Sequence, residues 1–460
     1  MITILSANPN VIGCGDEPVD GCHGLKSLQN RTSCAPRLDY QFASVQVEFN
    51  YICDEAKMVK NTITVQTFGV LVGAAIFGQF SDNFGRRTAL LIAAFGNGIL
   101  NIVVAYSPDL TYFMIWRTLS GIFAGGLTVV QMVYMVENIP RKHRMWIQNS
   151  ITWSPNLIIF PYIAYLCHDW RTLSVVIGGA SLLSFVTILF LQESPRWLVQ
   201  KGKLDEARRV LVKIRKTDRL YTQDFEKEID EILTIESQKF SKSSKKSKKY
   251  NFVHLFCTWK MMAQSFTFIF GIICTTFIVY ALMYNMEKLS GSLYWNSAII
   301  GASRWIINIA VSIIDYRCEW FGRKLVNQIC MSLTAISLAF IALFTYVGHG
   351  ETIQSIGTIV TLAMCSQLFI AKYLMVNELY PTAVRNIAVS AVSTFSRVGS
   401  MFSPQLFYLS DITEWLPYAV LFILQTLDLI SFCIVIPETK GVHLENHLPP
   451  KHKRIFGKHT

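Results

Sequence analysis

Apolar residues in this chain are gathered into long blocks that are separated by short polar joints. A helix needs about 20 predominantly apolar residues to cross a bilayer. Eleven blocks of this kind cover residues 62–81, 88–105, 112–136, 146–166, 172–191, 261–285, 294–314, 325–346, 353–375, 387–409 and 416–436. The pattern therefore predicts an all-α, polytopic membrane protein with about eleven spans.

The composition agrees with this prediction, because hydrophobic residues make up 52% of the chain and charged residues only 16%. Soluble domains carry about 25% charged residues, so a soluble enzyme is excluded. The sequence has neither an H-E-x-x-H metal motif nor a phosphate-binding loop. We therefore expect no enzymatic activity, no cofactor and no metal site.

The net charge of +11 is explained by where the basic residues lie. They are concentrated in alternate joints, at 85–87, 140–144, beyond 196, at 322–324, at 385 and at 451–454. Basic joints face the cytoplasm, which predicts a cytoplasmic C-terminal tail and an external segment at 1–61. Charge that sets membrane orientation gives no reason to expect nucleic-acid binding, whereas the basic stretch 241–249 is expected to touch anionic lipid.

The external assignment of residues 1–61 has independent support. The segment contains an even set of cysteines and the glycosylation sequon at Asn30. These cysteines are Cys14, Cys22, Cys34 and Cys53. We expect two disulfides, for which three pairings are possible, and a glycan on Asn30.

Three motifs occur twice, in the same order, at an offset of about 240 residues. The pattern E-x-x-P-x-x-x-R stands at 137–144 and again at 378–385. The acid-x-x-Gly-Arg-basic pattern stands at 82–87 and 319–324, and the segment 193–196 is matched loosely by 437–440. Two halves of the chain are therefore parallel copies, as in secondary transporters.

The repeat also defines the expected domains. After the external segment come a five-span bundle at 62–192, a cytoplasmic loop at 193–260, a six-span bundle at 261–436 and a tail at 437–460. The first bundle lacks a partner for the span at 261–285. We expect that one helix of a six-plus-six design is missing, and we favour a truncated chain over a genuine eleven-span protein.

At these motifs the sequence resembles a known family. GQFSDNFGRR at 78–87 and QESPRWL at 192–198 are similar to signatures of the major facilitator superfamily. ELYPTAVRN at 378–386, SRVGSMFSP at 396–404 and PETKG at 437–441 resemble the organic cation, organic anion and carnitine transporters more narrowly. The resemblance implies a major facilitator fold that moves a small organic ion by alternating access. It covers essentially the whole chain except for the family's first helix.

The inner joints carry candidate gating residues. They are Asp82, Gly85, Arg86, Arg87, Glu137, Arg144, Glu193, Arg196, Glu319, Arg323, Glu378, Arg385 and Glu438. We expect the acids and bases to form ion pairs between neighbouring bundles, which close the inner side and break when it opens. The alternative is that these charges only set topology on solvated loops. The duplicated acids favour a gate, because acids contribute little to orientation.

Ionisable residues inside predicted spans are candidates for substrate recognition. They are Arg117, Arg304, Lys372, Arg397 and Asp428. Bases outnumber acids, which favours an anion, and the resemblance places Arg397 where anion and carnitine carriers have an arginine. The alternatives are a structural Arg397–Asp428 pair, and a Lys372 side chain that extends toward the cytoplasmic surface. Tyr280 and Tyr284 are expected to complete the substrate site, with packing as the alternative.

We therefore predict a plasma-membrane carrier of organic anions or zwitterions such as carnitine. An organic cation carrier, a sugar or polyol carrier and a non-transporting pseudo-transporter remain alternatives. The expected partners are the small organic ion and membrane lipid, with a coupled ion left open and a monomer as the expected state.

Overall fold

The computed structural model describes residues 34–139, 155–217, 229–235, 252–286, 291–317, 322–348 and 351–439. It also describes 2–5, 7, 9–15, 17–18, 22, 25, 289 and 455. Predictions for Asn30, Arg144, Glu319 and the basic stretch 241–249 lie outside the described residues.

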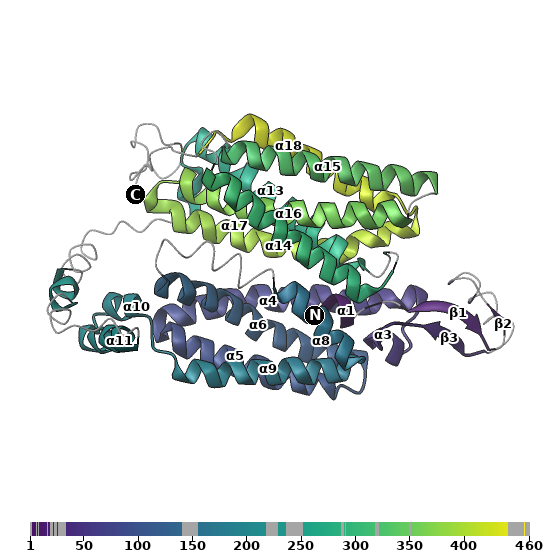
Figure 1. The fold of residues 1–460 in the computed structure, drawn as a ribbon, viewed down its shortest axis with the longest axis horizontal. Helices are drawn as coiled ribbons and strands as arrows, with labels where there is room; N and C mark the ends of the chain where they lie inside the picture. The colour runs from purple at the N-terminus through teal and green to yellow at the C-terminus, as the bar shows by residue number, and fades with distance from the viewer. Residues whose placement is uncertain are drawn as a thin grey trace. The chain divides into compact units, whose positions relative to one another are not determined.

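Each of the eleven predicted spans coincides with a helix (Figure 1). The helices are α4 (Ala56–Phe84), α5 (Arg86–Ala105), α6 (Leu110–Asn138), α8 (Asn156–Cys167), α9 (Trp170–Phe190), α13 (Trp259–Tyr284), α14 (Leu293–Arg317), α15 (Arg323–Val347), α16 (Glu351–Leu379), α17 (Thr382–Phe402) and α18 (Leu416–Val435). Among the described residues, nine of these are long and apolar enough to cross a membrane. The predicted all-α membrane fold is confirmed.

The two remaining helices, α8 and α17, are shorter than the blocks that the sequence predicted. Helix α8 has 12 described residues, and the earlier part of its predicted block falls outside the described part of the chain. Helix α17 ends at Phe402, where the predicted block ran on to 409, and a 3₁₀ helix at Ser403–Asp411 (η5) follows. Pro404 explains the change, because proline has no N–H to continue the α-helical hydrogen bonds.

The chain divides into two compact units, which we describe separately. Unit 1 comprises residues 1–67, 146–173 and 250–460, and unit 2 comprises 68–145 and 174–249. The boundary crosses α4 and α9, so the N-terminal end of α4 and all of α8 group with the C-terminal helices. The domain boundaries predicted from the sequence stay a prediction.

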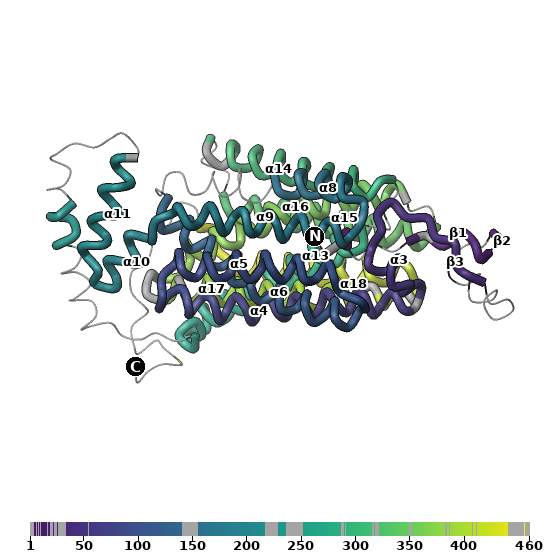
Figure 2. The backbone as a smooth tube through the Cα atoms, turned by 90° about the horizontal axis from the view of Figure 1, so that it is seen from below, coloured from purple at the N-terminus to yellow at the C-terminus, as the bar shows by residue number. Residues whose placement is uncertain are grey.

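In unit 2, most of α4 packs closely against α6 because both helices carry small residues. A Cβ added to Gly73 would meet the backbone of Ile122, and one added to Gly125 would meet that of Val70. Figure 2 shows α4, α5 and α6 side by side. Close approach of this kind is the role that small-xxx-small spacing predicts.

Beyond these helices, unit 2 continues into α10 (Pro195–Gln200) and α11 (Leu204–Thr217). Ser194 caps α10 by accepting a hydrogen bond from the Trp197 N–H, and Pro195 occupies its first turn. Trp197 and Leu198 pack with Ala207 of α11 in a small apolar cluster. The predicted loop at 193–260 therefore begins with two helices, α10 and α11.

In unit 1, helices α13 to α18 enclose an apolar core (Figure 1). Phe268 of α13, Met331 of α15, Leu368 and Met375 of α16 and Phe432 of α18 are all at most 1% exposed in this core. Thr258 begins α13 by accepting a hydrogen bond from the Met261 N–H at 3.3 Å. The short 3₁₀ helix Phe252–Phe256 (η3) precedes it.

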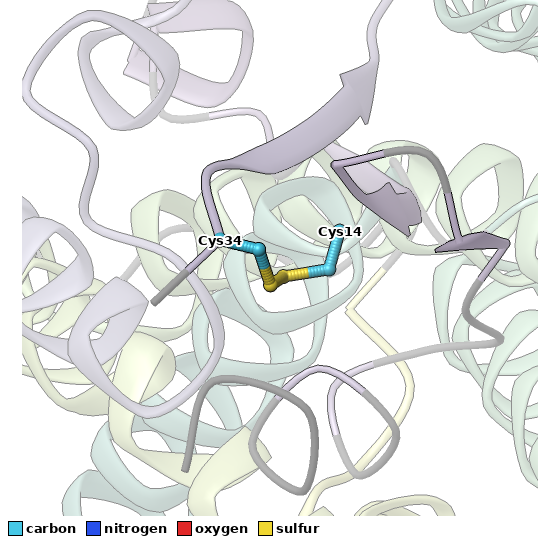
Figure 3. The surroundings of a disulfide bond; sticks show 2 residues. All are labelled: Cys14 and Cys34. Carbon is cyan, nitrogen blue, oxygen red and sulfur yellow. A yellow bond between two sulfur atoms is a disulfide. The ribbon is translucent and has the colours of Figure 1, made fainter. Parts of the chain in front are cut away.

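The N-terminal part of unit 1 contains a three-stranded antiparallel sheet in the order β2-β1-β3. Its strands are β1 (Asn10–Cys14), β2 (Glu17–Pro18) and β3 (Pro36–Asp39). Disulfides join Cys14 to Cys34 (Figure 3) and Cys22 to Cys53. The structure thus contains one of the three pairings that the sequence allowed.

Short helices connect this sheet to the rest of unit 1. They are α1 (Ile2–Leu5), α3 (Val45–Glu48) and the 3₁₀ helix Cys53–Glu55 (η1). The Glu48 carboxylate forms an ion pair with Arg171 at 2.6 Å and accepts a hydrogen bond from the Trp170 indole N–H. The N-terminal segment is therefore fixed to the start of α9.

Candidate functional site

The inner joints of unit 2 form a compact network of charged residues. The Glu193 carboxylate accepts hydrogen bonds from the backbone N–H groups of Arg86 at 2.8 Å and Arg87 at 3.1 Å. The Arg86 side chain pairs with Glu137 at 3.2 Å and with Asp82. A carboxylate at a helix N-terminus is favourable because it satisfies free N–H groups and meets the positive end of the helix dipole.

The inner joints of unit 1 repeat this arrangement. The Glu438 carboxylate accepts hydrogen bonds from the backbone N–H groups of Arg323 at 2.9 Å and Lys324 at 3.1 Å. The Arg323 Nε lies 3.0 Å from Glu378 Oε1, and the Thr439 hydroxyl donates to Glu378 at 2.7 Å. The duplicated motifs therefore build similar networks twice, once in unit 2 and once in unit 1.

Glycines make room for both capping carboxylates. Gly85 has φ of +107°, and a Cβ placed there would lie 2.5 Å from Glu193 Oε2. A Cβ at Gly322 would meet the Glu438 carboxylate. Each glycine is thus required by the close approach of a side chain, and Gly85 also by its backbone conformation.

Other candidate gating residues lie near these networks. Arg87 donates to the Leu189 carbonyl at 2.7 Å, and Arg385 donates to the Tyr380 carbonyl at 3.3 Å. Burial raises the pKa of Tyr380 to about 12, so its hydroxyl stays neutral and bonds to Ser265. Arg196 is exposed on α10. The described pairs form within each unit, whereas we expected pairing between bundles.

The candidate substrate residues that lie together come from four helices of unit 1. Arg397 of α17 interacts electrostatically with Tyr284 of α13 and Tyr373 of α16. Arg304 of α14 interacts with Tyr280, whose ring centroid lies 5.7 Å from that of Tyr284. We call these five residues the arginine–tyrosine cluster. Sequence reasoning missed Tyr373, although it directly follows Lys372.

The two arginines of this cluster lack acidic partners in the part of the chain that the structure describes. Neither Arg304 nor Arg397 forms an ion pair there, and both are half-buried. Such side chains can hold a carboxylate or sulfate through two parallel hydrogen bonds, with tyrosine rings as the walls.

Lys372 and Asp428 are placed differently from what we expected. Lys372 Nζ lies 2.6 Å from Asp428 Oδ2, and the two side chains are 1% and 0% exposed. The alternative in which Lys372 extends toward the cytoplasmic surface is wrong, because its ammonium bonds to α13 and α18. The alternative pairing of Asp428 with Arg397 is also wrong, since Lys372 is the partner. Their predicted role in substrate binding stays a prediction.

Arg117 belongs to a separate polar network inside unit 2. Its guanidinium donates to Asn101 at 3.3 Å, and Asn101 donates to the Ser120 hydroxyl at 3.0 Å. Asn97 extends the network to Ser181 of α9 at 3.1 Å. The network joins α5, α6 and α9. Asn97 and Asn101 stand four residues apart within the apolar block 88–105. Their spacing could have predicted this network, but we did not use it.

The N-terminal end of α4 forms hydrogen bonds with the C-terminal helices within unit 1. Lys60 donates to the Asn285 side chain at 3.1 Å. Asn61 accepts hydrogen bonds from Gln405 at 3.0 Å and from the Tyr408 hydroxyl at 2.6 Å. Sequence reasoning assigned no role to these residues.

Known proteins resemble this chain along most of its length. A family model described as "Sugar (and other) transporter" matches residues 29–447. Mouse organic anion transporter 3 is 26% identical over 388 residues, which cover 82% of this chain and 69% of the relative. Mouse solute carrier family 22 member 3 is 27% identical over 437 residues, with 92% and 75% covered.

Solved structures show the same fold. The inward open xylose transporter XylE from E. coli superposes with a TM-score of 0.64 at 19% identity, covering 84% of this chain and 88% of XylE. The proton:xylose symporter XylE bound to 6-bromo-6-deoxy-D-glucose gives a TM-score of 0.62 at 19% identity, with 85% and 89% covered. The expected resemblance is confirmed, and the chain is a multi-pass membrane transporter, not an enzyme. It belongs to the sugar (and other) transporter family of the major facilitator superfamily.

Proposed function

We propose that this protein carries organic anions, or zwitterions with a carboxylate such as carnitine, by alternating access. The observation that carries the proposal is the pair of half-buried arginines, Arg304 and Arg397, which have no acidic partner among the described residues. The buried carboxylate of the C-terminal helices, Asp428, is already paired with Lys372. The arginine–tyrosine cluster is therefore positively charged.

The charge of the cluster argues against the other cargoes. An organic cation would be repelled by two guanidinium groups at short range. A sugar would leave both of them without a charged partner, which is costly in a site shielded from water. One of the relatives, mouse organic anion transporter 3, is named for organic anions, which fits this proposal.

Uptake by membranes that contain the chain tests this proposal. We expect labelled urate or carnitine to enter faster than labelled tetraethylammonium. Arg397→Ala should abolish anion uptake, and Arg397→Lys should restore only part of it, because an ammonium cannot form the two-pronged hydrogen bond. Arg209→Ala, an exposed arginine on α11, is the matched control. Tetraethylammonium uptake that survives Arg397→Ala would refute the anion preference.

We also propose that the two inner networks act as the cytoplasmic gate. The duplicated geometry of Glu193 and Glu438 supports this, because each carboxylate connects the end of the last span of its half to the start of an earlier helix. The plasma membrane, a cytoplasmic C-terminal tail and a monomeric state remain our proposals for its location and assembly. Surface labelling of an epitope at the C-terminus before and after permeabilisation tests the orientation.

A further inference from the structure

The ion pair of Lys372 and Asp428 lies inside the C-terminal helices and is not used by the proposed anion site. Lys372 Nζ donates to Asp428 Oδ2 at 2.6 Å, to the Gly271 carbonyl at 2.8 Å and to the Thr275 hydroxyl at 2.9 Å. An ammonium has three donors. All three are therefore satisfied, and α16 is connected to both α13 and α18.

The carboxylate is less well satisfied than the ammonium. Asp428 Oδ1 is buried and has no hydrogen-bond partner among the residues that the structure describes. Gln425, one turn earlier on α18, is also fully buried, and neither atom of its amide finds a partner in that part of the chain. Gly271 allows the pair to approach α13 closely, since a Cβ there would lie 2.5 Å from Oδ1 and 2.8 Å from Lys372 Nζ. Buried polar atoms without partners are rare and indicate a missing ligand or a functional role.

The ligand of Oδ1 must be small and must tolerate a neighbouring positive charge. A metal cation needs about six oxygen ligands, whereas the unpartnered oxygens described here are Asp428 Oδ1 and Gln425 Oε1. A proton needs one oxygen atom and no shell of ligands. It neutralises the carboxylate and leaves the charge of the Lys372 ammonium uncompensated, which loosens the pair. We propose that Asp428 is a proton-binding site of this transporter and takes up one proton at Oδ1 during the transport cycle. The proton is delivered by hydronium from solution, which is left as water, and it converts the carboxylate to a neutral carboxylic acid.

The surroundings of the pair are compatible with this proton uptake. Among the described titratable groups, Cys274 of α13 interacts with both members of the pair and Cys365 of α16 interacts with Lys372. Lys372 is the charged group that acts on Asp428 there. When Asp428 is neutral, the ammonium still keeps the Gly271 carbonyl and the Thr275 hydroxyl as acceptors. Protonation therefore weakens the link between α16 and α18 without leaving Lys372 unsatisfied.

The pair shares its helices with the arginine–tyrosine cluster. Tyr373 follows Lys372 on α16, and Tyr280 lies beyond Thr275 on α13. A change in the contact between α16 and α18 would therefore reach two helices that carry substrate residues. This coupling to transport rests on the proposed function, whereas proton binding by Asp428 does not.

Infrared difference spectroscopy of the purified full chain in liposomes tests proton binding without any substrate. Between mildly alkaline and mildly acidic pH, the wild type should gain the carbonyl stretching band of a protonated, buried carboxylic acid. Asp428→Asn should remove this band, whereas Asp205→Asn, an exposed acid on α11, should leave it unchanged. If Asp428→Asn does not fold, the double variant Lys372→Met/Asp428→Leu replaces it, because it removes both charges together. A wild type without the band, or a band that persists in these variants, would overturn the proposal.

Transport in the same liposomes tests the coupling. An inward proton gradient should change the initial rate of labelled urate or carnitine uptake several-fold in the wild type. The double variant should lose this response, so that the ratio of its uptake rates with and without the gradient falls to about one. Uptake that ignores the gradient in the wild type would refute the coupling. If none of the probes is transported, the proposed cargo is wrong, while the infrared band still decides whether Asp428 binds a proton.

Discussion

The buried pair of Lys372 and Asp428 allows a sharp prediction about stability. Removing one partner of a buried ion pair typically destabilises a protein by about 3–5 kcal/mol, whereas replacing both with apolar residues is often neutral. In Asp428→Leu, the Lys372 ammonium keeps two of its three acceptors. In Lys372→Met, the Asp428 carboxylate loses its only side-chain donor among the described residues, because Oδ1 already has none.

We therefore expect a definite order of stabilities. Lys372→Met should lower the free energy of unfolding by about 5 kcal/mol, the upper end of that range, and Asp428→Leu should lower it by about 3 kcal/mol. The double variant should differ from the wild type by only about 1–2 kcal/mol. Acidification should partly rescue Lys372→Met, because a proton can neutralise the carboxylate that has lost its ammonium. It should not rescue Asp428→Leu, which leaves a cation.

The assay is unfolding of the detergent-solubilised protein, followed by heat or denaturant at two pH values. The interaction free energy comes from the cycle of both single variants and the double variant. Single variants that are no less stable than the double variant would refute the reasoning, since the pair would then contribute no specific stabilisation. Equal pH responses of the two single variants would contradict the assignment of the unsatisfied oxygen to Asp428.

Three further predictions concern other sites. In thermal unfolding, Gly85→Ala should destabilise the protein by about 1–3 kcal/mol, because the new Cβ meets Glu193 and the backbone φ is positive. The control Gly78→Ala should be neutral or stabilising, because the space around Gly78 is open. Glu193→Gln and Glu438→Gln should slow labelled-anion uptake to similar extents, because each carboxylate caps a helix in the same way; a defect in only one of them would contradict a shared gating role. Peptide mapping by mass spectrometry under non-reducing conditions should recover Cys14 linked to Cys34 and Cys22 linked to Cys53, and any other pairing would contradict the structure.

The sequence predicted the helices well because span length depends on local composition alone. Apolar blocks of membrane length predicted the position of every spanning helix, while α17 ended early at Pro404. Partners of charged residues were harder to predict. Extension of Lys372 toward the cytoplasmic surface was one alternative, and its pairing with Asp428 was not foreseen, because the faces of α13 and α18 that enclose it are fixed by contacts distant in sequence. Cysteine spacing likewise left three pairings, and the fold selects one.

The repeated motifs predicted a set of charges that form ion pairs, but not which of them pair with each other. Arg86 was expected to pair with charges of the neighbouring bundle, yet it binds Glu137 within unit 2. Arg323 and Glu378 do the same within unit 1. A motif at fixed spacing repeats the local geometry of its own half, whereas contacts between halves depend on the state of the carrier. The gating proposal therefore rests on the duplicated geometry alone.

The comparison of the two halves also separates what the fold requires from what this protein has added. Glu193 and Glu438 cap a helix in both halves although their flanking sequences differ, so this contact belongs to the repeated framework. Lys372 stands six residues before Glu378, and the equivalent position before Glu137 is Gln131. Asp428 stands ten residues before Glu438, and its equivalent before Glu193 is Leu183. Since the first half builds the same fold with neutral residues at both positions, the buried charges are not required for folding. A pair that is costly to bury and unnecessary for the fold is best explained by a function, and proton binding is the function that its unsatisfied oxygen supports.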